Sequence, residues 1–381
     1  MDGNRLNIAP EPDEIEISVF GPGYGESILL HLGGNNWFII DSCIDPLTQE
    51  PAPLIYLQEI NINPSVSIRQ VIATHWHDDH VRGLGKILKS CTSAEFVCSD
   101  ALRPEEFNEL VASYGVRTMM KSSGVDEFRE VMEVLQQRKS QLGKRYITPI
   151  FASSNRHLWH GLLNSSEMNY ECSIYALSPS DASILAARLD IENLLPKEET
   201  PKRRLLAITP NRAAVVLWVS AGHFNILFGS DLEESEDPQT GWSVIINSAN
   251  RPSGKASFFK IPHHGSKSAH HPAVWTEMLE REPIAVLTPY EKGNNRLPTK
   301  QDINRMCALT SNAYTTADPL KRRAIRRDKT VEKTIKETVR NIRQVNPSIG
   351  HVRLRAKQQS AWNIELFGDA ISLIGLMKRY N

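Results

Sequence analysis

The segment VIATHWHDDHVRG, residues 71–83, places three histidines and two aspartates directly after an apolar run. Alternate residues of an extended segment project to one side, so His75 and His77 can reach one metal ion. Asp79 and His80 follow on a turn and can reach a second. Zinc and similar divalent metals accept this mixture of imidazole and carboxylate. Burial of so many polar groups without a ligand would be costly, so the spacing favours a metal site over solvated histidines.

The segments around this motif indicate an α/β protein. Residues 66–74 have the pattern of a buried strand, and VRGLGKILKS, which follows the motif, can begin a helix. The histidines would therefore lie at the carboxyl end of a strand, where α/β proteins carry their active sites. Further strands are predicted at 15–20, 35–42, 172–180, 213–220, 224–231, 257–266 and 284–290.

The chain is interpreted as one domain, residues 1–381, with a core over about 15–300. Residues 104–170 are predicted to be a helical insertion, because 104–146 show helical spacing and few strand signals. Residues 300–381 are predicted to contain a basic helix and a closing β-hairpin that completes a sheet outside the active site.

The composition and the charge balance disfavour several classes of protein. Forty-four basic residues balance forty-four acidic residues, so net charge does not point to nucleic acid or to a membrane surface. The five cysteines are scattered without a C-x-x-C pair, which disfavours a disulfide framework and a zinc knuckle. No apolar stretch reaches eighteen residues and the first residues are polar, so a cytoplasmic protein without membrane contact is expected.

The motif Thr74–His80 resembles the signature of the metallo-β-lactamase fold superfamily, and this implies a four-layer αββα sandwich. Three further segments match the superfamily in the expected order: FIIDS with Asp41, ILFGSDLE with Asp231, and KIPHHGS with His263 and His264. The stretches GPGYGESILL and HHGS look closest to the hydrolase domain of competence-type DNA-uptake channels.

The resemblance implies a role for each matching residue. His75 and His77 would hold one metal ion, Asp79 and His80 the second, and Asp231 would bridge them. His263 would complete the second site, with His264 supporting it or facing the substrate, although the reverse assignment stays open. Asp41 would orient a ligand histidine. The cofactor implied is two divalent ions, zinc first and manganese or iron as alternatives, which share a hydroxide. The predicted catalytic residues are Asp79, His264 and Asp41.

Two positions depart from the superfamily pattern. Asn211 stands where most members carry another histidine ligand, so the first metal ion would have fewer protein ligands. Leu297 replaces a histidine of an N-x-x-x-H-P element, which indicates a changed substrate. His157, His160 and His223 are the other possible donors, and each is typical of a surface histidine.

The substrate is indicated by one local feature. Between Lys321 and Arg343, ten basic residues outweigh three acidic ones, and Val331, Ile335, Val339 and Ile342 have amphipathic spacing. This segment favours a phosphate-binding surface for nucleic acid or a nucleotide; the alternative is a solvated helix packed by its apolar stripe. The leading hypothesis is a phosphodiesterase or nuclease. The alternatives are a hydrolase of a lactone or thioester, and a metal-binding module that serves protein partners in a bacterial defence or DNA-processing system.

Overall fold

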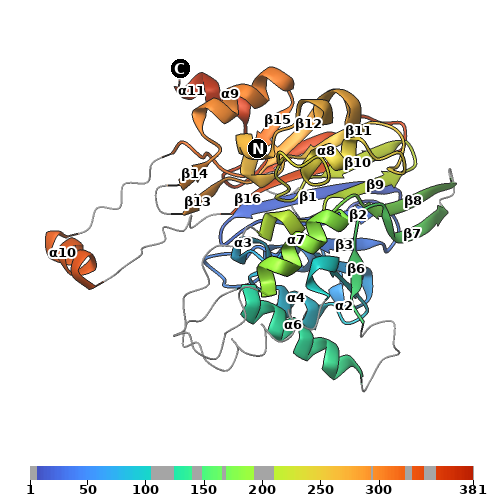
Figure 1. Cartoon of the computed structure of the whole chain (residues 1–381), viewed down its shortest axis with the longest axis horizontal. Coiled ribbons are helices and arrows are strands. Elements are labelled where there is room, and N and C mark those ends of the chain that lie inside the picture. Colours follow the sequence, from blue (N-terminus) through green and yellow to red (C-terminus); the bar gives the residue numbers. More distant parts are fainter. Residues whose placement is uncertain are drawn as a thin grey trace.

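Two eight-stranded sheets pack face to face between two layers of helices (Figure 1). This is the four-layer αββα sandwich that the sequence predicted. The computed structural model describes residues 7–103, 124–139, 148–164, 169–192, 210–292, 295–321, 328–338 and 349–380.

The first sheet combines the N-terminal strands with two strands from near the C-terminus. Its β3, β4, β5 and β6 run parallel, and its other neighbours are antiparallel. In spatial order its strands are β17 (Asn363–Phe367), β16 (Ile349–Lys357), β1 (Glu14–Pro22), β2 (Ser27–Leu32), β3 (Trp37–Ile40), β4 (Ile68–Ala73), β5 (Glu95–Ser99) and β6 (Ile150–Ala152).

The second sheet has a parallel centre formed by β10, β11, β12 and β15. Its order is β18 (Ile371–Ser372), β15 (Ala313–Thr315), β12 (Leu279–Leu287), β11 (Ala256–Lys260), β10 (Phe224–Phe228), β9 (Leu217–Ala221), β8 (Asn169–Ala176) and β7 (Arg156–Asn164). A separate two-stranded hairpin consists of β13 (Tyr290–Lys292) and β14 (Asn295–Leu297).

Helices cover the outer face of each sheet. The first sheet is covered by α1 (Ala52–Glu59), α3 (Asp78–Val81), α4 (Leu84–Ser90) and α6 (Gly124–Lys139). The second is covered by α8 (Gly241–Ile246), α9 (Lys300–Leu309) and α11 (Leu373–Tyr380). The other α-helices of the described residues are α2 (Pro64–Ser67), α7 (Asp181–Glu192) and α10 (Lys329–Thr338). None of the helices within the described ranges is long and apolar enough to cross a bilayer.

Hydrophobic residues form one core between the sheets and one beneath each helical layer. Residues such as Ile17 on β1 and Val219 on β9 meet in the central core, because alternate side chains of a strand point to opposite faces. The other faces of both sheets pack against the helices, which explains why inner strands such as β2, β3 and β5 are buried along their whole length.

Two predicted boundaries differ from the structure. The predicted helical insertion, 104–170, contains α6 but also strands β6 and β7, and RHLWHGLLN pairs with β8 as a β-hairpin. Residues 104–123 and 140–147 lie outside the described residues. The sandwich also continues beyond residue 300, since β15, β16, β17 and β18 belong to the two sheets. Because β16 pairs with β1, which is distant in the sequence, the strand pattern alone could not place it.

Candidate metal centre

The loop after β4 carries the histidine motif, and its start is held by Asp41. The backbone N–H and the hydroxyl of Thr74 donate hydrogen bonds to Asp41 Oδ1 and Oδ2, each at 2.8 Å. Asp41 follows β3, the parallel neighbour of β4. From this fixed point His75 and His77 leave the strand end, while Asp79 and His80 lie on α3.

The second sheet supplies the remaining residues of the centre. Asp231 follows β10 and His264 follows β11, and these strands are parallel neighbours whose carboxyl ends lie together. His264 has a positive φ of 55°, a conformation that residues other than glycine adopt rarely and that is common at functional sites. The centre therefore lies where strand ends of the two sheets meet.

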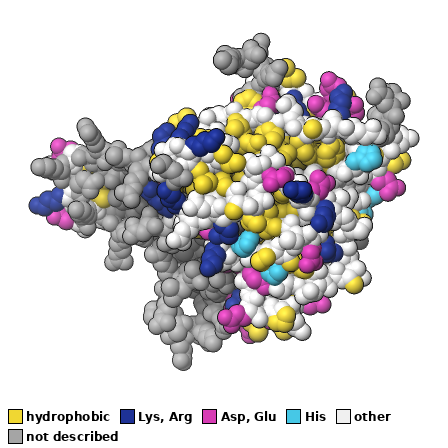
Figure 2. Space-filling model, turned by 90° about the horizontal axis from the view of Figure 1, so that it is seen from above, with side chains coloured by type: hydrophobic (Ala, Val, Ile, Leu, Met, Phe, Trp, Pro, Cys, Tyr) yellow, Lys and Arg dark blue, Asp and Glu magenta, His cyan; other side chains and the backbone are white. Residues whose placement is uncertain are grey.

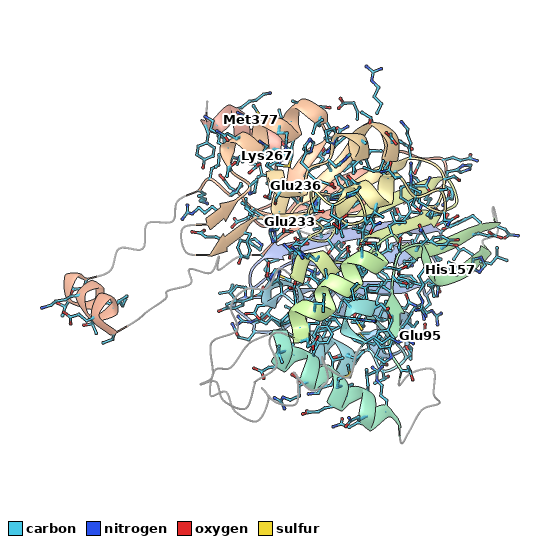
Figure 3. The ribbon with its side chains drawn as sticks, in the orientation of Figure 1. Glu95, His157, Glu233, Glu236, Lys267 and Met377 are labelled. Atoms are coloured by element: carbon cyan, nitrogen blue, oxygen red, sulfur yellow. The ribbon has the colours of Figure 1, made fainter. Side chains whose placement is uncertain are left out.

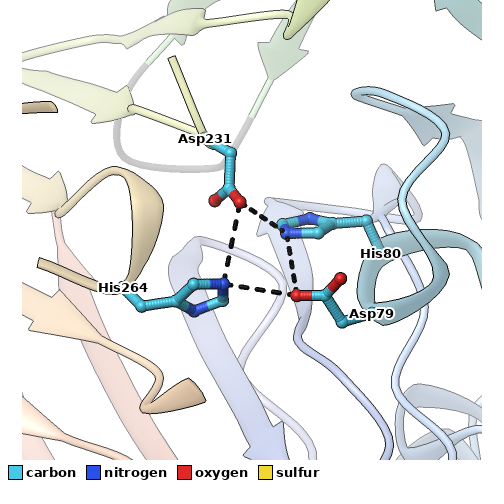
Figure 4. Close-up of side chains that lie close together, drawn as sticks. All are labelled: Asp79, His80, Asp231 and His264. Carbon is cyan, nitrogen blue, oxygen red and sulfur yellow. Dashed lines mark ion pairs between the residues drawn. The ribbon is translucent and has the colours of Figure 1, made fainter. Parts of the chain in front are cut away.

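Four buried side chains converge in one group (Figure 4). Asp231 Oδ2 lies 3.4 Å from His80 Nε2 and 3.6 Å from His264 Nε2. Asp79 Oδ2 lies 3.3 Å from His264 Nε2 and 3.8 Å from His80 Nε2. We call Asp79, His80, Asp231 and His264 the four-donor group. Two imidazole nitrogens and two carboxylates form a ligand set that suits zinc.

A second group shares Asp231 with the first. His75, His77 and Asp231 also offer atoms close enough to hold one ion, and we call them the three-donor group. His75 Nε2 lies 3.9 Å from Asp231 Oδ2 and 3.1 Å from His77 Nδ1. Asp231 is thus placed between two sets of donors.

Hydrogen bonds at Nδ1 turn three imidazoles toward the centre. His80 Nδ1 donates to Asp41 Oδ2 at 2.8 Å, and His264 Nδ1 donates to the Thr288 carbonyl at 2.9 Å. The Thr74 hydroxyl already donates to Asp41, so it accepts from His75 Nδ1 at 3.0 Å. In its neutral form each imidazole then has its Nε2 lone pair facing the carboxylates, as a metal ligand requires.

Unsatisfied buried atoms show that these residues fit a metal ion. Among the described residues, His80 Nε2 and Asp231 Oδ1 are buried without a hydrogen-bond partner. Burial alone would raise the pKa of Asp231, but the imidazoles of His80 and His264 hold it well below its usual range. Burial would lower the pKa of His80, yet the carboxylates of Asp231 and Asp41 raise it well above. A proton and a metal ion would compete for the same Nε2 lone pair.

The sequence prediction placed His263 in the metal set, and this assignment is corrected. His264 occupies that position, while His263 Nδ1 faces Glu233 Oε1 at 3.1 Å outside both groups. Glu233, labelled in Figure 3, also accepts a 3.1 Å hydrogen bond from Asn211 Nδ2. Burial alone would raise the Glu233 pKa, but hydrogen bonds from His263 and Ser268 lower it to about 2. Adjacent residues of a tight turn point in different directions, which sequence spacing does not reveal.

Sequence reasoning also missed an ion pair behind the four-donor group. Lys260 Nζ donates to Glu26 Oε1 and Oε2 at 2.8 and 2.9 Å, and both side chains are buried. Glu26 Oε2 lies 3.7 Å from His264 Nδ1, and the Glu26 backbone N–H donates to the Asp79 carbonyl. A charged residue inside the apolar stretches GESILL and SFFKIP was the available signal.

The other candidate donors lie outside both groups. His157 and His160 are on β7, an edge strand of the second sheet, and Figure 3 shows His157 far from Glu233. His223 is exposed in the turn between β9 and β10. These positions agree with their interpretation as surface histidines.

Comparison with known proteins identifies the family. The model of the metallo-beta-lactamase superfamily matches residues 20–271, more than half of the chain. The chain belongs to the metallo-beta-lactamase superfamily. No curated protein sequence matches it.

Three solved structures resemble this superfamily member at low identity. The metallo-beta-lactamase fold protein YhfI from Bacillus subtilis is 11% identical, with 79% of this chain and 95% of that chain covered and a TM-score of 0.37. The metallo-beta-lactamase SMB-1, bound to 2-mercaptoethanesulfonate, is 14% identical, with 61% and 70% covered and a TM-score of 0.26. Zn(2+)-bound PqqB from Methylobacterium extorquens is 12% identical, with 61% and 58% covered and a TM-score of 0.27.

Membership of the metallo-beta-lactamase superfamily and the clustered donors together support a metal-dependent hydrolase. A cavity of about 560 Å³ opens beside the four-donor group, with Asp79 and His264 in its wall. This volume is within the range of small-molecule binding sites.

Proposed function

We propose that the protein is a phosphodiesterase that works with two divalent metal ions, zinc foremost. The observation that carries the proposal is the position of Asp231, whose Oδ2 lies 3.4 Å from His80 Nε2, 3.6 Å from His264 Nε2 and 3.9 Å from His75 Nε2. One carboxylate between two donor groups is the arrangement that a bridged pair of ions requires. Such pairs are used for in-line displacement at phosphorus.

When bound, the ions would supply Lewis acidity and activate water near neutral pH. The four-donor group and the three-donor group would hold one ion each. Asp41 orients His80 directly and His75 through the Thr74 hydroxyl. The Glu26–Lys260 ion pair lies on the Nδ1 side of His264 and supports that imidazole. These contacts hold the donor atoms in place before a substrate binds, which lowers the reorganisation that the reaction requires.

The cavity is lined by three cations and by four acids, Asp79, Glu291, Asp318 and Asp369, and two divalent ions held beside Asp79 would make its net charge positive, which favours an anionic substrate. Its wall includes Arg296, Lys321 and Arg379, and Lys321 is the first residue of the predicted basic segment 321–343. Of that segment the structure describes Lys321 and residues 328–338, and α10 stands apart from the sandwich in Figure 1. Figure 2 shows positive and negative side chains mixed on the face in view. The resemblance of GPGYGESILL and HHGS to competence-type hydrolase domains adds support; a protein partner stays a prediction.

The test is turnover of bis-p-nitrophenyl phosphate by protein loaded with zinc or manganese. We expect turnover that is abolished by the double substitution His77→Ala, Asp79→Ala. His223→Ala, an exposed histidine outside both groups, is the matched control and should keep wild-type turnover. Hydrolysis of p-nitrophenyl acetate or a lactone with no phosphodiester turnover would replace the proposal with a carbonyl hydrolase.

A further inference from the structure

The cavity beside the metal centre is built largely by chain segments beyond the family match, which ends at residue 271. One wall comes from β13 and β14, a second from residues 317–321, and a third from the turn after β17 and the end of α11. Figure 1 shows α11 and the β13–β14 hairpin at the same end of the sandwich. These segments, and not the superfamily motifs, would therefore set which substrate enters.

Among the described residues, two of the cations that line the cavity have no carboxylate partner and can bind a ligand. Glu291 pairs with Arg296, and Asp318 accepts hydrogen bonds from the Tyr380 hydroxyl at 3.0 Å and from the Lys321 backbone N–H at 3.1 Å. Within the described part of the chain, the Lys321 ammonium and the Arg379 guanidinium have no carboxylate partner, and both side chains are exposed. The other acids on the wall are Asp79, which belongs to the four-donor group, and Asp369.

The remaining wall is suited to an organic group. Tyr290 stacks on His264, with ring centroids 4.9 Å apart, and Tyr380 is 41% exposed. Six apolar residues also line the cavity: Pro22, Pro289, Ala317, Pro319, Ala370 and Ile371. Aromatic faces of this kind stack on nucleobases without regard to base type. An inorganic polyphosphate would leave this apolar surface uncovered.

We propose that the cavity binds a phosphodiester of dinucleotide size, with the scissile phosphate at Asp79 and His264 and a terminal phosphate at Lys321 and Arg379. The inference rests on the proposed phosphodiesterase function and adds its substrate class. A cavity of about 560 Å³ holds a ligand of this size, whereas a double helix would need an open surface. Arg379 suits a phosphate oxygen pair because its guanidinium is a planar fork of donors.

The test compares two substrates that differ only in the terminal phosphate. Zinc-loaded full-length protein is assayed with thymidylyl-(3′→5′)-thymidine that carries a 5′-terminal phosphate and with the same dinucleotide without that phosphate. We expect kcat/KM to be about tenfold higher for the phosphorylated dinucleotide, as for one exposed charge-assisted contact. The double substitution Lys321→Gln, Arg379→Gln should reduce this ratio to about one. Lys378→Gln removes a neighbouring exposed cation that does not line the cavity, and it should keep the ratio.

Binding gives a readout that is independent of turnover. Calorimetry on the zinc-loaded protein should show thymidine 3′,5′-bisphosphate binding about tenfold more tightly than thymidine 3′-monophosphate, which lacks only the terminal phosphate, with the difference lost in the double variant. Equal kcat/KM for the two dinucleotides, or a ratio that survives in the double variant, would overturn the inference. Turnover of bis-p-nitrophenyl phosphate without turnover of either dinucleotide would overturn it too. Absence of turnover with all three substrates would instead contradict the proposed phosphodiesterase function, on which this inference rests.

Discussion

Asp41 and His80 form a buried hydrogen bond of 2.8 Å that joins the end of β3 to α3. Because Asp41 Oδ2 accepts from His80 Nδ1, His80 Nε2 is directed toward Asp79 and Asp231. Asp41 also accepts from Thr74, whose hydroxyl in turn accepts from His75. One carboxylate thereby fixes a histidine in each of the two donor groups.

Asp41→Asn should therefore weaken metal binding at both groups while the fold is kept. The asparagine retains an acceptor for Thr74 but loses the carboxylate that orients His80. Loss of such a supporting group lowers metal affinity by about 10- to 100-fold. Competition titration with a chelating indicator measures the affinity, and Asp13→Asn, ahead of β1, is the matched control. Unchanged affinity in Asp41→Asn would mean that this hydrogen bond does not hold the ligand.

Because His264, and not His263, lies in the four-donor group, the same substitution should have different effects on metal content at the two positions. Both residues have positive φ, 45° and 55°, so asparagine is the suitable replacement because it tolerates this conformation. His264→Asn can keep the hydrogen bond to the Thr288 carbonyl but removes the Nε2 atom, so the four-donor group should lose its ion. His263→Asn should keep wild-type metal content. Mass spectrometry of metal content distinguishes the two, and equal losses would refute the assignment.

Asn211→His is expected to strengthen the weaker of the two metal sites. Asn211 Oδ1 is buried without a hydrogen-bond partner among the described residues, and the superfamily resemblance places a histidine ligand there. The three-donor group has one donor fewer than the four-donor group, so zinc titration of the wild type should resolve a tight and a weak step. The weak step should tighten in Asn211→His. If it stays unchanged, Asn211 does not lie within reach of that ion.

His31 gives a pH dependence of stability that is separate from the metal centre. Burial lowers the pKa of His31 from 6.5 to about 4. Between pH 4 and pH 6.5, His31 binds more protons in the unfolded chain than in the folded protein. The contribution of the neutral, buried His31 to the free energy of unfolding is therefore fully present above pH 6.5 and is lost as the pH decreases toward 4. The loss from this residue is about 2 kcal/mol between pH 7.5 and pH 5.

Urea unfolding of the metal-free protein at these two pH values measures that loss. His31→Gln can keep the hydrogen bond to the Gly34 carbonyl, made by Nε2 at 2.9 Å, without a titrating group. Its stability should therefore fall less with acid than that of the wild type. The exposed His223→Gln should follow the wild type, and parallel curves for His31→Gln would contradict the prediction.

The donors that follow β4 could be predicted because they are neighbours in the chain. His75 to His80 lie within one turn at a strand end, where periodicity and residue type suffice. His264 could not be told from His263, because their directions depend on two consecutive left-handed backbone conformations. Asp41 and Asp231 were placed only through the resemblance to a known family.

The contribution of the C-terminal region could not be predicted from local patterns. The pairing of β16 with β1 joins residues such as Val352 and Val19, and an alternating pattern does not specify a partner so distant in sequence. The turn of the closing hairpin was predicted to lie outside the active site. Instead, Gly368 to Ile371 line the cavity beside His264, together with Arg379 and Tyr380.

The central claim is that Asp231 lies between two metal ions, and metal content per chain tests it most directly. The protein is stripped with a chelator, reloaded with zinc, passed through a desalting column and analysed by mass spectrometry beside the variant Asp231→Asn. The account predicts two zinc ions per chain in the wild type and loss from both donor groups in the variant. Zinc content in the wild type no higher than in the variant would contradict it.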